Sequence, residues 1–373
     1  MKVAIVHYWL VNMRGGEKVL EALCELYPQA DIYTHVYDPK NISDAIKKHQ
    51  INTTFIQHLP RAIQWYQNYL PLMPIALRFL SLKKYDLVIS SESGPAKGVR
   101  LNNKAMYVCY CHSPMRYVWD LFDEYFRSVG FFKKLMMLLL MKPLRIWDRW
   151  TSKRVNQFIA NSTTVQKRIL NCYQRDSVVI HPPVDIDHFQ IQHSEGDYYL
   201  LFGQLIQYKR PDLAIEAFNQ SGRKLVVIGQ GGMLEVLRKQ AKPNIQFLGR
   251  LDDDQIRGYL ASCKAIIFPG LEDFGIVPVE AMACGRPVIA YGKGGVLDTV
   301  VNGKTGIYFE TQTAQALNEA IERFEKSPNQ FNPQAIREWT QRFSKEQFQN
   351  QFFEMVHSLL KSKLNKPKSE REL

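Results

Sequence analysis

Short apolar runs alternate with longer segments of helical periodicity along most of the chain. Runs rich in β-branched residues that end in a turn signal are typical of buried parallel strands, and the segments between them are typical of crossover helices. The runs lie at residues 3–9, 86–92, 105–112, 157–162, 198–203, 224–229, 245–249, 265–270, 287–292 and 306–309. The pattern predicts an α/β fold with two doubly wound halves.

Chain length and two prolines indicate where the halves divide. The chain has 373 residues, and a single core seldom grows beyond about 250–300 residues. Pro182 and Pro183 lie between the halves, where proline cannot continue a helix and is a poor residue for a central strand. We therefore expect one domain over residues 1–183 and a second over 184–344.

The composition excludes several classes of protein. With 46% hydrophobic and 23% charged residues, the chain is neither disordered nor collagen-like, nor a small disulfide-rich protein. Its first ten residues predict a buried strand and not a signal peptide, and its longest apolar run, residues 135–141, is far shorter than the roughly 18–20 residues of a membrane span. The six cysteines lack zinc-ligand spacing, which indicates a reduced, cytosolic protein without a structural metal.

Positive charge is concentrated in one segment. The net charge is +12, from 48 basic and 36 acidic residues, so phosphates, nucleic acid and anionic lipid are candidate partners. Residues 127–154 hold eight basic residues and one acidic residue among aromatic and aliphatic side chains. We expect residues 131–150 to bind an anionic membrane surface, and residues 59–84 to add a second apolar surface. The alternative is a core helix with solvated lysines; without a nucleic-acid motif, no nucleic-acid partner is expected.

Two glycine-containing turns at strand ends suit phosphate groups. Gly15 and Gly16 follow the first strand and precede a helical stretch, where free backbone N–H groups and the helix dipole favour an anion. Gly203 ends a later strand, and the cations Lys209 and Arg210 follow it just before a helix. A merely tight turn at the first site and a solvated basic helix start at the second are the alternatives.

A third motif places two carboxylates eight residues apart. Glu272 lies in a loop after a strand, and Glu280 is expected inside a helix that begins near Phe274 or Gly275. The loop and the first helical turn can present both carboxylates, which are good acceptors for paired sugar hydroxyls, to one ligand. The N–H groups of Gly275 and Ile276 would then face a phosphate.

The acidic clusters at residues 185–187 and 252–254 are where a metal ion on a diphosphate could bind. The first lies in the expected linker, and the second precedes a helix, where aspartate commonly serves as an N-cap. We therefore expect neither a metal ion nor another cofactor. No side chain is singled out as a covalent nucleophile.

Together these residues resemble the family-4 retaining glycosyltransferases, whose GT-B architecture has two Rossmann-like domains that face each other across a cleft. Glu272 and Glu280 match the E-x7-E motif of that family, Lys209 its diphosphate-binding lysine, and Gly15 and Gly16 its glycine pair. The resemblance covers essentially the whole chain.

Three stretches are similar to the branch that transfers mannose or glucose in bacterial O-antigen and exopolysaccharide synthesis. They are HSPMRYVWD at 112–120, IHPPVD at 180–185 and YKRPDLAIEAF at 208–218. Within that branch, the chain resembles a cyanobacterial envelope-polysaccharide enzyme.

The resemblance implies a metal-independent, retaining hexosyltransferase. It would move a hexose from a nucleotide sugar, UDP-glucose before GDP-mannose, to a lipid-linked polysaccharide at the cytoplasmic face of the plasma membrane, as a peripheral protein. Residues 1–183, joined by a last helix in 345–373, would bind the acceptor, and residues 184–344 the donor. The inferred route is front-face substitution through an oxocarbenium-like state, in which the departing phosphate helps to deprotonate the acceptor.

The resemblance also implies roles for single residues. Glu280 would accept the ribose hydroxyls, Glu272 would bind the transferred sugar, and Lys209 would neutralise the leaving diphosphate. His112 would lie near the donor sugar; a core histidine at a strand end is the alternative. The catalytic candidates are His112, Lys209 and Glu272. The donor-binding candidates are Gly15, Gly16, Gln204, Lys209, Arg210, Arg250, Glu272, Phe274, Gly275, Ile276 and Glu280.

One position departs from the family pattern. Gln204 stands where the family usually has arginine, which removes one of two expected diphosphate cations, and Arg210 either compensates or points to solvent. This departure makes a non-catalytic, membrane-associated subunit of a polysaccharide assembly complex an alternative. Because fold alone does not fix function, a nucleotide-sugar epimerase or a phosphorylase of the same architecture is another.

Overall fold

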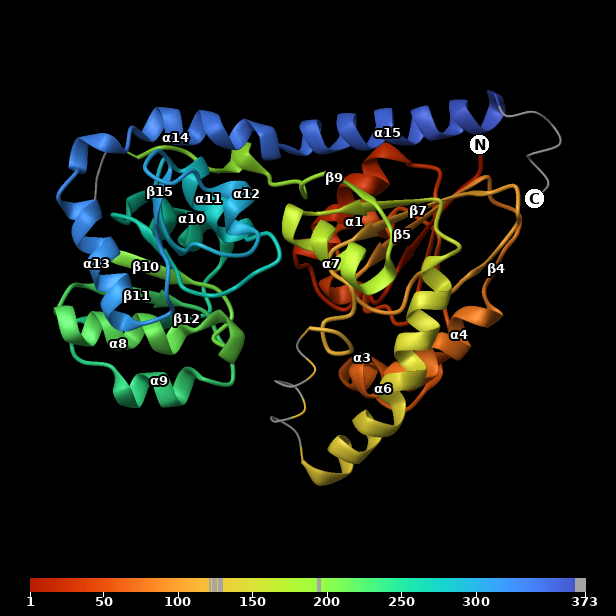
Figure 1. Cartoon of the computed structure of the whole chain (residues 1–373), viewed down its shortest axis with the longest axis horizontal. Coiled ribbons are helices and arrows are strands. Elements are labelled where there is room, and N and C mark those ends of the chain that lie inside the picture. The colour runs from red at the N-terminus through yellow and green to blue at the C-terminus, as the bar shows by residue number, and fades with distance from the viewer. Residues whose placement is uncertain (121, 123–125, 127–129, 193–195, 366–373) are drawn as a thin grey trace. The chain divides into compact units, whose positions relative to one another are not determined.

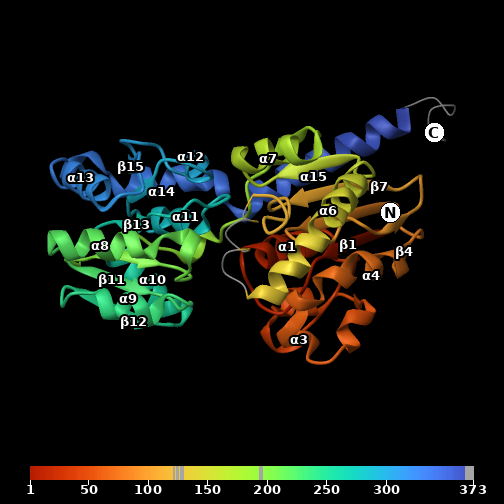
Figure 2. The ribbon, with the colours of Figure 1, turned by 60° about the horizontal axis from the view of Figure 1, so that its bottom comes forward.

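The computed structural model describes residues 1–120, 122, 126, 130–192 and 196–365. Two compact units make up the fold: unit 1 is Met1–Pro183 with Phe348–Leu373, and unit 2 is Val184–Gln347. Each unit is a parallel sheet between helices (Figures 1 and 2). The α/β class and the two doubly wound sheets confirm the fold that the hydrophobic pattern predicts.

Unit 1 is built on a seven-stranded parallel sheet of order β3-β2-β1-β5-β7-β8-β9. Its strands are β1 (Val3–His7), β2 (Asp31–Thr34), β3 (Ile51–Thr53), β5 (Leu87–Glu92), β7 (Met106–Cys111), β8 (Gln157–Ala160) and β9 (Ser177–Val179), beside a short pair, β4 (Ser81–Leu82) and β6 (Arg100–Leu101). Its helices are α1 (Gly15–Leu26), α2 (Asp44–Lys47), α3 (Ala62–Trp65), α4 (Met73–Phe79), α6 (Phe131–Ser152), α7 (Thr163–Tyr173) and α15 (Lys345–Asn365).

The alternation of side chains along the strands gives unit 1 two cores, one on each face of the sheet. Ile5 of β1 packs in a cluster with α1, α2 and α15, whereas its neighbours Ala4 and Val6 pack in a cluster with α4 and α7. Phe348 and Phe352 of α15 are buried in the first of these clusters. The last helix of the chain is therefore part of unit 1.

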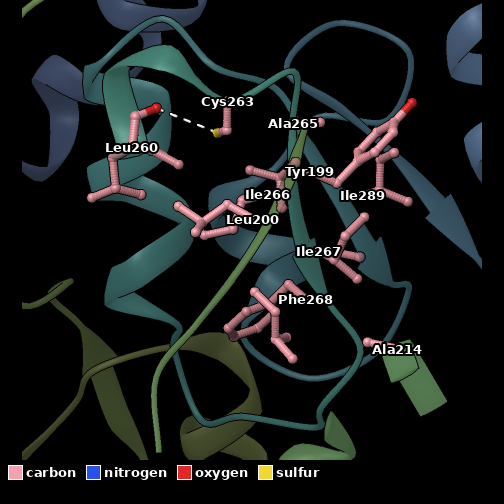
Figure 3. Packing of buried hydrophobic residues seen from close by; sticks show 14 of the residues in the cluster. Tyr199, Leu200, Ala214, Leu260, Cys263, Ala265, Ile266, Ile267, Phe268 and Ile289 are labelled. Atoms are coloured by element: carbon pink, nitrogen blue, oxygen red, sulfur yellow. Dashed lines mark hydrogen bonds between the residues drawn. The ribbon is translucent and has the colours of Figure 1, made fainter. Parts of the chain in front are cut away.

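Unit 2 is built on a six-stranded parallel sheet of order β12-β11-β10-β13-β14-β15. Its strands are β10 (Tyr199–Phe202), β11 (Leu225–Ile228), β12 (Ile245–Gly249), β13 (Ile266–Phe268), β14 (Val288–Tyr291) and β15 (Gly306–Phe309). Its helices are α8 (Pro211–Ser221), α9 (Leu234–Gln240), α10 (Asp253–Ser262), α11 (Ile276–Ala283), α12 (Val296–Thr299), α13 (Ala314–Glu325) and α14 (Pro333–Thr340). One buried cluster, part of which Figure 3 shows around β10 and β13, holds the unit together.

Strand order marks the place for a ligand in each unit. In unit 2 the chain winds from β10 to β11 and β12 on one side and then crosses to β13 on the other; in unit 1 the same reversal falls between β1 and β5. Doubly wound sheets bind ligands beyond the carboxyl ends of the strands at such a switch point. The predicted site motifs that follow β1, β10 and β13 lie beside these two points.

Helix α6 is anchored by buried side chains near its carboxyl end and is exposed along its amino-terminal half. Asp148 and Thr151 are fully buried, whereas Phe131 and Leu139 are 76% and 63% exposed. In the carboxyl-terminal half Ile146 is also exposed, at 70%. Figure 1 shows the amino-terminal half of the helix leading away from the sheet of unit 1. Arg127, the first basic residue of the charged segment, lies outside the described residues. Among the helices of the described residues, none is both long and apolar enough to span a bilayer.

Candidate functional site

In unit 2 the loops after β10 and β13 meet. Lys209, which ends a short 3-10 turn after β10, places its Nζ 2.8 Å from Oε1 of Glu272 in the loop after β13. Both side chains keep about one-fifth of their surface exposed. These two residues line one pocket together with Gly203 and Gln204. The structure thus brings together the lysine and the first glutamate that the sequence singles out.

Glycines allow the loops to approach so closely. A Cβ on Gly270 would lie 2.7 Å from Cα of Lys209, and a Cβ on Gly229 would collide with the carbonyl of Gly203. Gly203 and Gly229 also have φ of +141° and +143°, which L side chains rarely adopt. A side chain at Gly270 or Gly229 would force the neighbouring backbone to shift, and one at Gly203 would be disfavoured by its positive φ alone.

Helix α11 supplies the second glutamate. Gly275, with φ of +88°, caps the helix; Ile276 begins it, and Glu280 lies on its second turn, half-buried. Phe274 differs from expectation: its side chain is 3% exposed and packs edge-on against Phe343, with the ring centroids 5.6 Å apart. Its ring is therefore a core side chain, and only its backbone is left for a donor.

A glycine pair after β14 supports the Glu272 loop and is absent from the sequence predictions. The N–H of Gly295 donates to the carbonyl of Glu272 at 2.8 Å, and a Cβ on Gly294 would lie 2.7 Å from that same oxygen. The signal in the sequence is a Gly-Gly pair at the start of the helix that follows a strand, as at Gly15-Gly16. The loop that carries the glutamate is thus fixed from the neighbouring strand.

The two arginines predicted for the donor are placed differently from Lys209. Arg210, in the left-handed region with φ of +51°, donates from Nε to both carboxylate oxygens of Asp212 at 3.1 Å. Arg210, the cation expected to replace the arginine that the family has at the position of Gln204, is therefore paired with Asp212. Arg250 is exposed after β12, two strands from β10, and is not among the described residues that line the pocket.

In unit 1 the predicted histidine lies beside the glycine pair. His112 directly follows β7, and a Cβ on Gly16 would lie 3.6 Å from its Nε2 and would collide with the hydroxyl of Tyr8. Gly15 and Gly16 form the first turn of α1 rather than a loop before it, because Arg14 and Glu17 cap the helix through a hydrogen bond from the Arg14 N–H to the Glu17 carboxylate. The glycines therefore present helix N-terminal amides directly.

Burial holds His112 in its neutral form. Desolvation, with a further contribution from His7, lowers the pKa of His112 to about 3. Its Nε2 lies 2.8 Å from Oγ of Ser91, which in turn lies 3.1 Å from Nδ1 of His7. His7, Ser91 and Glu17 are not among the predicted site residues. For His7 and Ser91 the signal in the sequence is a polar residue at the end of an otherwise apolar strand, whereas Glu17 lies in the first turn of α1.

The acidic clusters considered for a metal have local roles. The side chain of Asp252 accepts from the N–H of Gln255 at 2.8 Å and caps α10, the role expected of it. Across the described parts of the chain, no group of three or more His, Cys, Asp or Glu side chains is placed to hold a metal ion.

Comparisons with known proteins agree with this geometry. Residues 13–188 match the family model described as Glycosyltransferase Family 4, and residues 183–343 match Glycosyl transferases group 1. An uncharacterised glycosyltransferase of Methanocaldococcus jannaschii is 27% identical over 48% of this chain and 52% of its own length. O-antigen chain mannosyltransferase C of Escherichia coli is 25% identical over 55% and 60%. The matches thus span only about half to three-fifths of these relatives.

The fold also agrees with a solved structure. Anabaena HepE, crystallised with UDP and glucose, aligns with a TM-score of 0.71 and 20% identity over 96% of this chain and all of that one. The two family models together cover residues 13–343; the first contains every strand of the sheet of unit 1 except β1, and the second contains all six strands of the sheet of unit 2. The chain is therefore a family-4 glycosyltransferase of the GT-B fold.

Proposed function

We propose that this protein transfers a hexose from a nucleotide sugar to a lipid-linked polysaccharide acceptor, with retention of configuration and without a metal ion. UDP-glucose is the favoured donor and GDP-mannose the next. The observation that carries the proposal is the Lys209–Glu272 pair at the switch point of unit 2, with Glu280 on the helix that follows. The UDP and glucose bound by HepE favour UDP-glucose, and the similarity to a mannosyltransferase is the reason to test GDP-mannose as well.

The pair at the switch point suits a substrate that is anionic at one end and rich in hydroxyls at the other. Lys209 supplies the positive charge that the diphosphate needs as the bond to the sugar breaks, and in a pocket partly shielded from water this charge acts strongly. Glu272 accepts from sugar hydroxyls, and Glu280 from the ribose. Lys209 pairs with Glu272, so a diphosphate that binds Lys209 would exchange one ion pair for another.

The acceptor assignment rests on the surface of α6. Its amino-terminal half exposes Leu135, Met136, Leu138 and Leu139 to between 48% and 63%, beside Lys142 and Arg145. Apolar side chains flanked by cations suit the headgroup region of an anionic bilayer. We propose that this surface binds the cytoplasmic face of the plasma membrane, where a lipid-linked acceptor is held.

Vesicle co-sedimentation tests the membrane assignment. Wild type should bind vesicles of phosphatidylglycerol and phosphatidylcholine at low salt, and Leu138→Glu with Leu139→Glu should abolish binding. Val236→Glu, at a 54% exposed position of α9 in unit 2, is the matched control. Equal binding by all three proteins, or none by wild type, would contradict the assignment.

Release of UDP or GDP from a panel of nucleotide sugars tests the catalytic proposal. Wild type should release nucleotide from one donor, and Glu272→Ala and Lys209→Ala should each lose that release. Lys224→Ala is the control, because Lys224 is an exposed lysine of unit 2 that is also paired with a carboxylate, that of Asp197. A wild type that binds no donor would refute the proposal. Interconversion of sugars without nucleotide release would indicate an epimerase instead.

A further inference from the structure

The switch point of unit 1 carries a tryptophan that the proposed function does not use. Trp9 lies two residues after β1, and Gly94 lies two residues after β5, the two strands at which the winding reverses. Both neighbours of Trp9 are buried, Tyr8 at 7% and Leu10 at 0% exposure, whereas Trp9 itself is partly exposed. A doubly wound sheet is expected to bind a ligand at this point.

Uncharged groups enclose part of the indole ring. The ring centroids of Trp9 and Tyr66 lie 4.8 Å apart with an interplanar angle of 51°, and Tyr8 meets the indole edge-on at 4.6 Å. A Cβ on Gly94 would lie 3.2 Å from Cζ3 of Trp9. The glycine therefore lets the loop after β5 lie against the indole, and none of these contacts involves a charged side chain.

The position of the indole is fixed by the fold of unit 1. The N–H of Leu10 donates to the carbonyl of Val36 at 2.7 Å, and the carbonyl of Leu10 accepts from the N–H of Asp38 at 2.8 Å. The ring of Trp9 also packs against two buried clusters, of which the second is the cluster that Tyr66 covers. A ring that is held in this way loses little side-chain entropy when a ligand binds to it.

The polar groups beside the indole suit a ligand that is rich in hydroxyls. The indole N–H of Trp9 is donated to no described residue and is open to solvent. The hydroxyl of Tyr66 accepts from Nε2 of Gln67 at 3.3 Å and keeps its own proton for another acceptor. Such rings combine a large apolar face with a hydrogen-bond donor at the edge. A pyranose is complementary to them, because its axial C–H groups form an apolar face and its hydroxyls surround that face.

We propose that Trp9 and Tyr66 form an aromatic platform on which a pyranose ring of the acceptor stacks. The assignment of this sugar to the acceptor rests on the proposed function. The contrast between the two switch points supports it. In unit 2, Lys209 and Glu272 place charges at the switch point, and a positive charge suits a diphosphate. In unit 1 the contacts of Trp9 are aromatic and uncharged, which suits a neutral glycan. The platform lies wholly within unit 1.

Nitrogen-15 NMR of the indole N–H groups tests the platform in the wild-type protein. The probes are the methyl pyranosides of glucose, mannose and galactose. At least one of them should shift the indole signal of Trp9, which Trp9→Phe identifies, and should leave the signal of Trp65, a 44% exposed residue of α3, unmoved. Glucitol, which has hydroxyls but no pyranose ring, should shift neither signal. A Trp9 signal that no pyranoside moves, or that glucitol moves equally, would overturn the platform.

Saturation-transfer NMR of the same pyranosides measures what the indole contributes to affinity. Trp9→Leu should weaken binding about 10-fold, and Trp9→Phe, which keeps an aromatic ring, about threefold. Trp65→Leu is the matched control, because it removes an exposed tryptophan of the same unit, and it should bind as the wild type does. Equal affinity in the wild type and a folded Trp9→Leu variant would refute the platform. If that variant does not fold, the wild-type indole shifts decide.

Sugar binding is measured apart from nucleotide release, so the two proposals can fail separately. A protein that releases nucleotide from a donor while pyranosides leave Trp9 unmoved would keep the proposed function and lose the platform. A protein whose Trp9 signal responds to pyranosides but that binds no nucleotide sugar would keep the platform. It would lose the proposed function, and with it the assignment of the sugar to the acceptor.

Discussion

Replacement of Lys97 by methionine should strongly destabilise unit 1. Nζ of Lys97 pairs with the carboxylates of Glu92 and Asp148. It also donates to the hydroxyl of Tyr173 at 3.2 Å. All three charged side chains are fully buried. Asp148 also accepts from Trp119 and from Tyr173, each at 2.8 Å. The lysine is thus the one cation of this buried cluster among the described residues.

The loss in free energy of unfolding depends on the two buried carboxylates that remain after Lys97 is replaced. Lys97→Met keeps the volume but leaves two carboxylates buried without a cation, and breaking such a pair costs about 3–5 kcal/mol. Burial already raises the pKa of Glu92 to about 7, despite the attraction of Lys97. A carboxyl whose folded-state pKa is raised favours folding below its unfolded value of about 4.5 and loses that contribution as pH rises. The variant should therefore be less destabilised at pH 5 than at pH 8.

Urea unfolding followed by tryptophan fluorescence measures this loss, because five of the six tryptophans belong to unit 1. Lys84→Met is the control: this lysine of the same unit is exposed and lies 3.5 Å from Asp31, so its removal should cost less than about 1 kcal/mol. A loss below about 1 kcal/mol for Lys97→Met at pH 8 would refute the reasoning. So would a loss that is larger at pH 5.

Three further predictions concern the donor site and pH. Lys209→Met should lower kcat about 100-fold with a smaller change in KM, measured by initial rates, because the leaving charge is stabilised only as it develops; an effect on KM alone would contradict this. Glu280→Gln should weaken donor binding about 10-fold by calorimetry, and unchanged affinity would remove it from the site. Burial lowers the pKa of His35 to about 4, so its contribution to stability, present above pH 6.5, is lost as pH falls, by about 3 kcal/mol between pH 7 and 4. His35→Gln should flatten that dependence in urea unfolding, and an unaltered slope would count against it.

Continuous apolar runs made the sheets predictable from the sequence. Strands that are buried on both faces carry such runs, and all ten predicted runs contain a strand of the structure. Strands β2, β3 and β9 escaped because their sequences, DIYT, INT and SVV, mix polar with apolar residues and form no continuous apolar run. β3 and β9 also lie at the edges of their sheet, where they are only partly buried. Short edge strands leave no periodic signal in the sequence.

The site was predictable where it depends on strand ends and not where it depends on packing. Lys209 and Glu272 follow strands that are neighbours in the sheet, so their meeting follows from topology. The core position of Phe274 depends on Phe343, 69 residues further along the chain, and no local pattern reveals such a contact. Which aromatic side chains face a ligand is thus settled by tertiary packing.

The buried cluster around Lys97 also explains how the surface helix and the candidate histidine share one support. Asp148 lies on α6, and Glu92 ends β5 and accepts the N–H of His112 through its carbonyl. An ion pair is a costly way to fix a helix when apolar packing would do so, and its value lies in the geometry that it imposes. Here that geometry ties the anchored end of α6 to the strand end that positions His112. A change that weakens this cluster should therefore disturb both the helix and the histidine, whereas a change in the exposed amino-terminal half of α6 should disturb neither the fold nor the placement of His112.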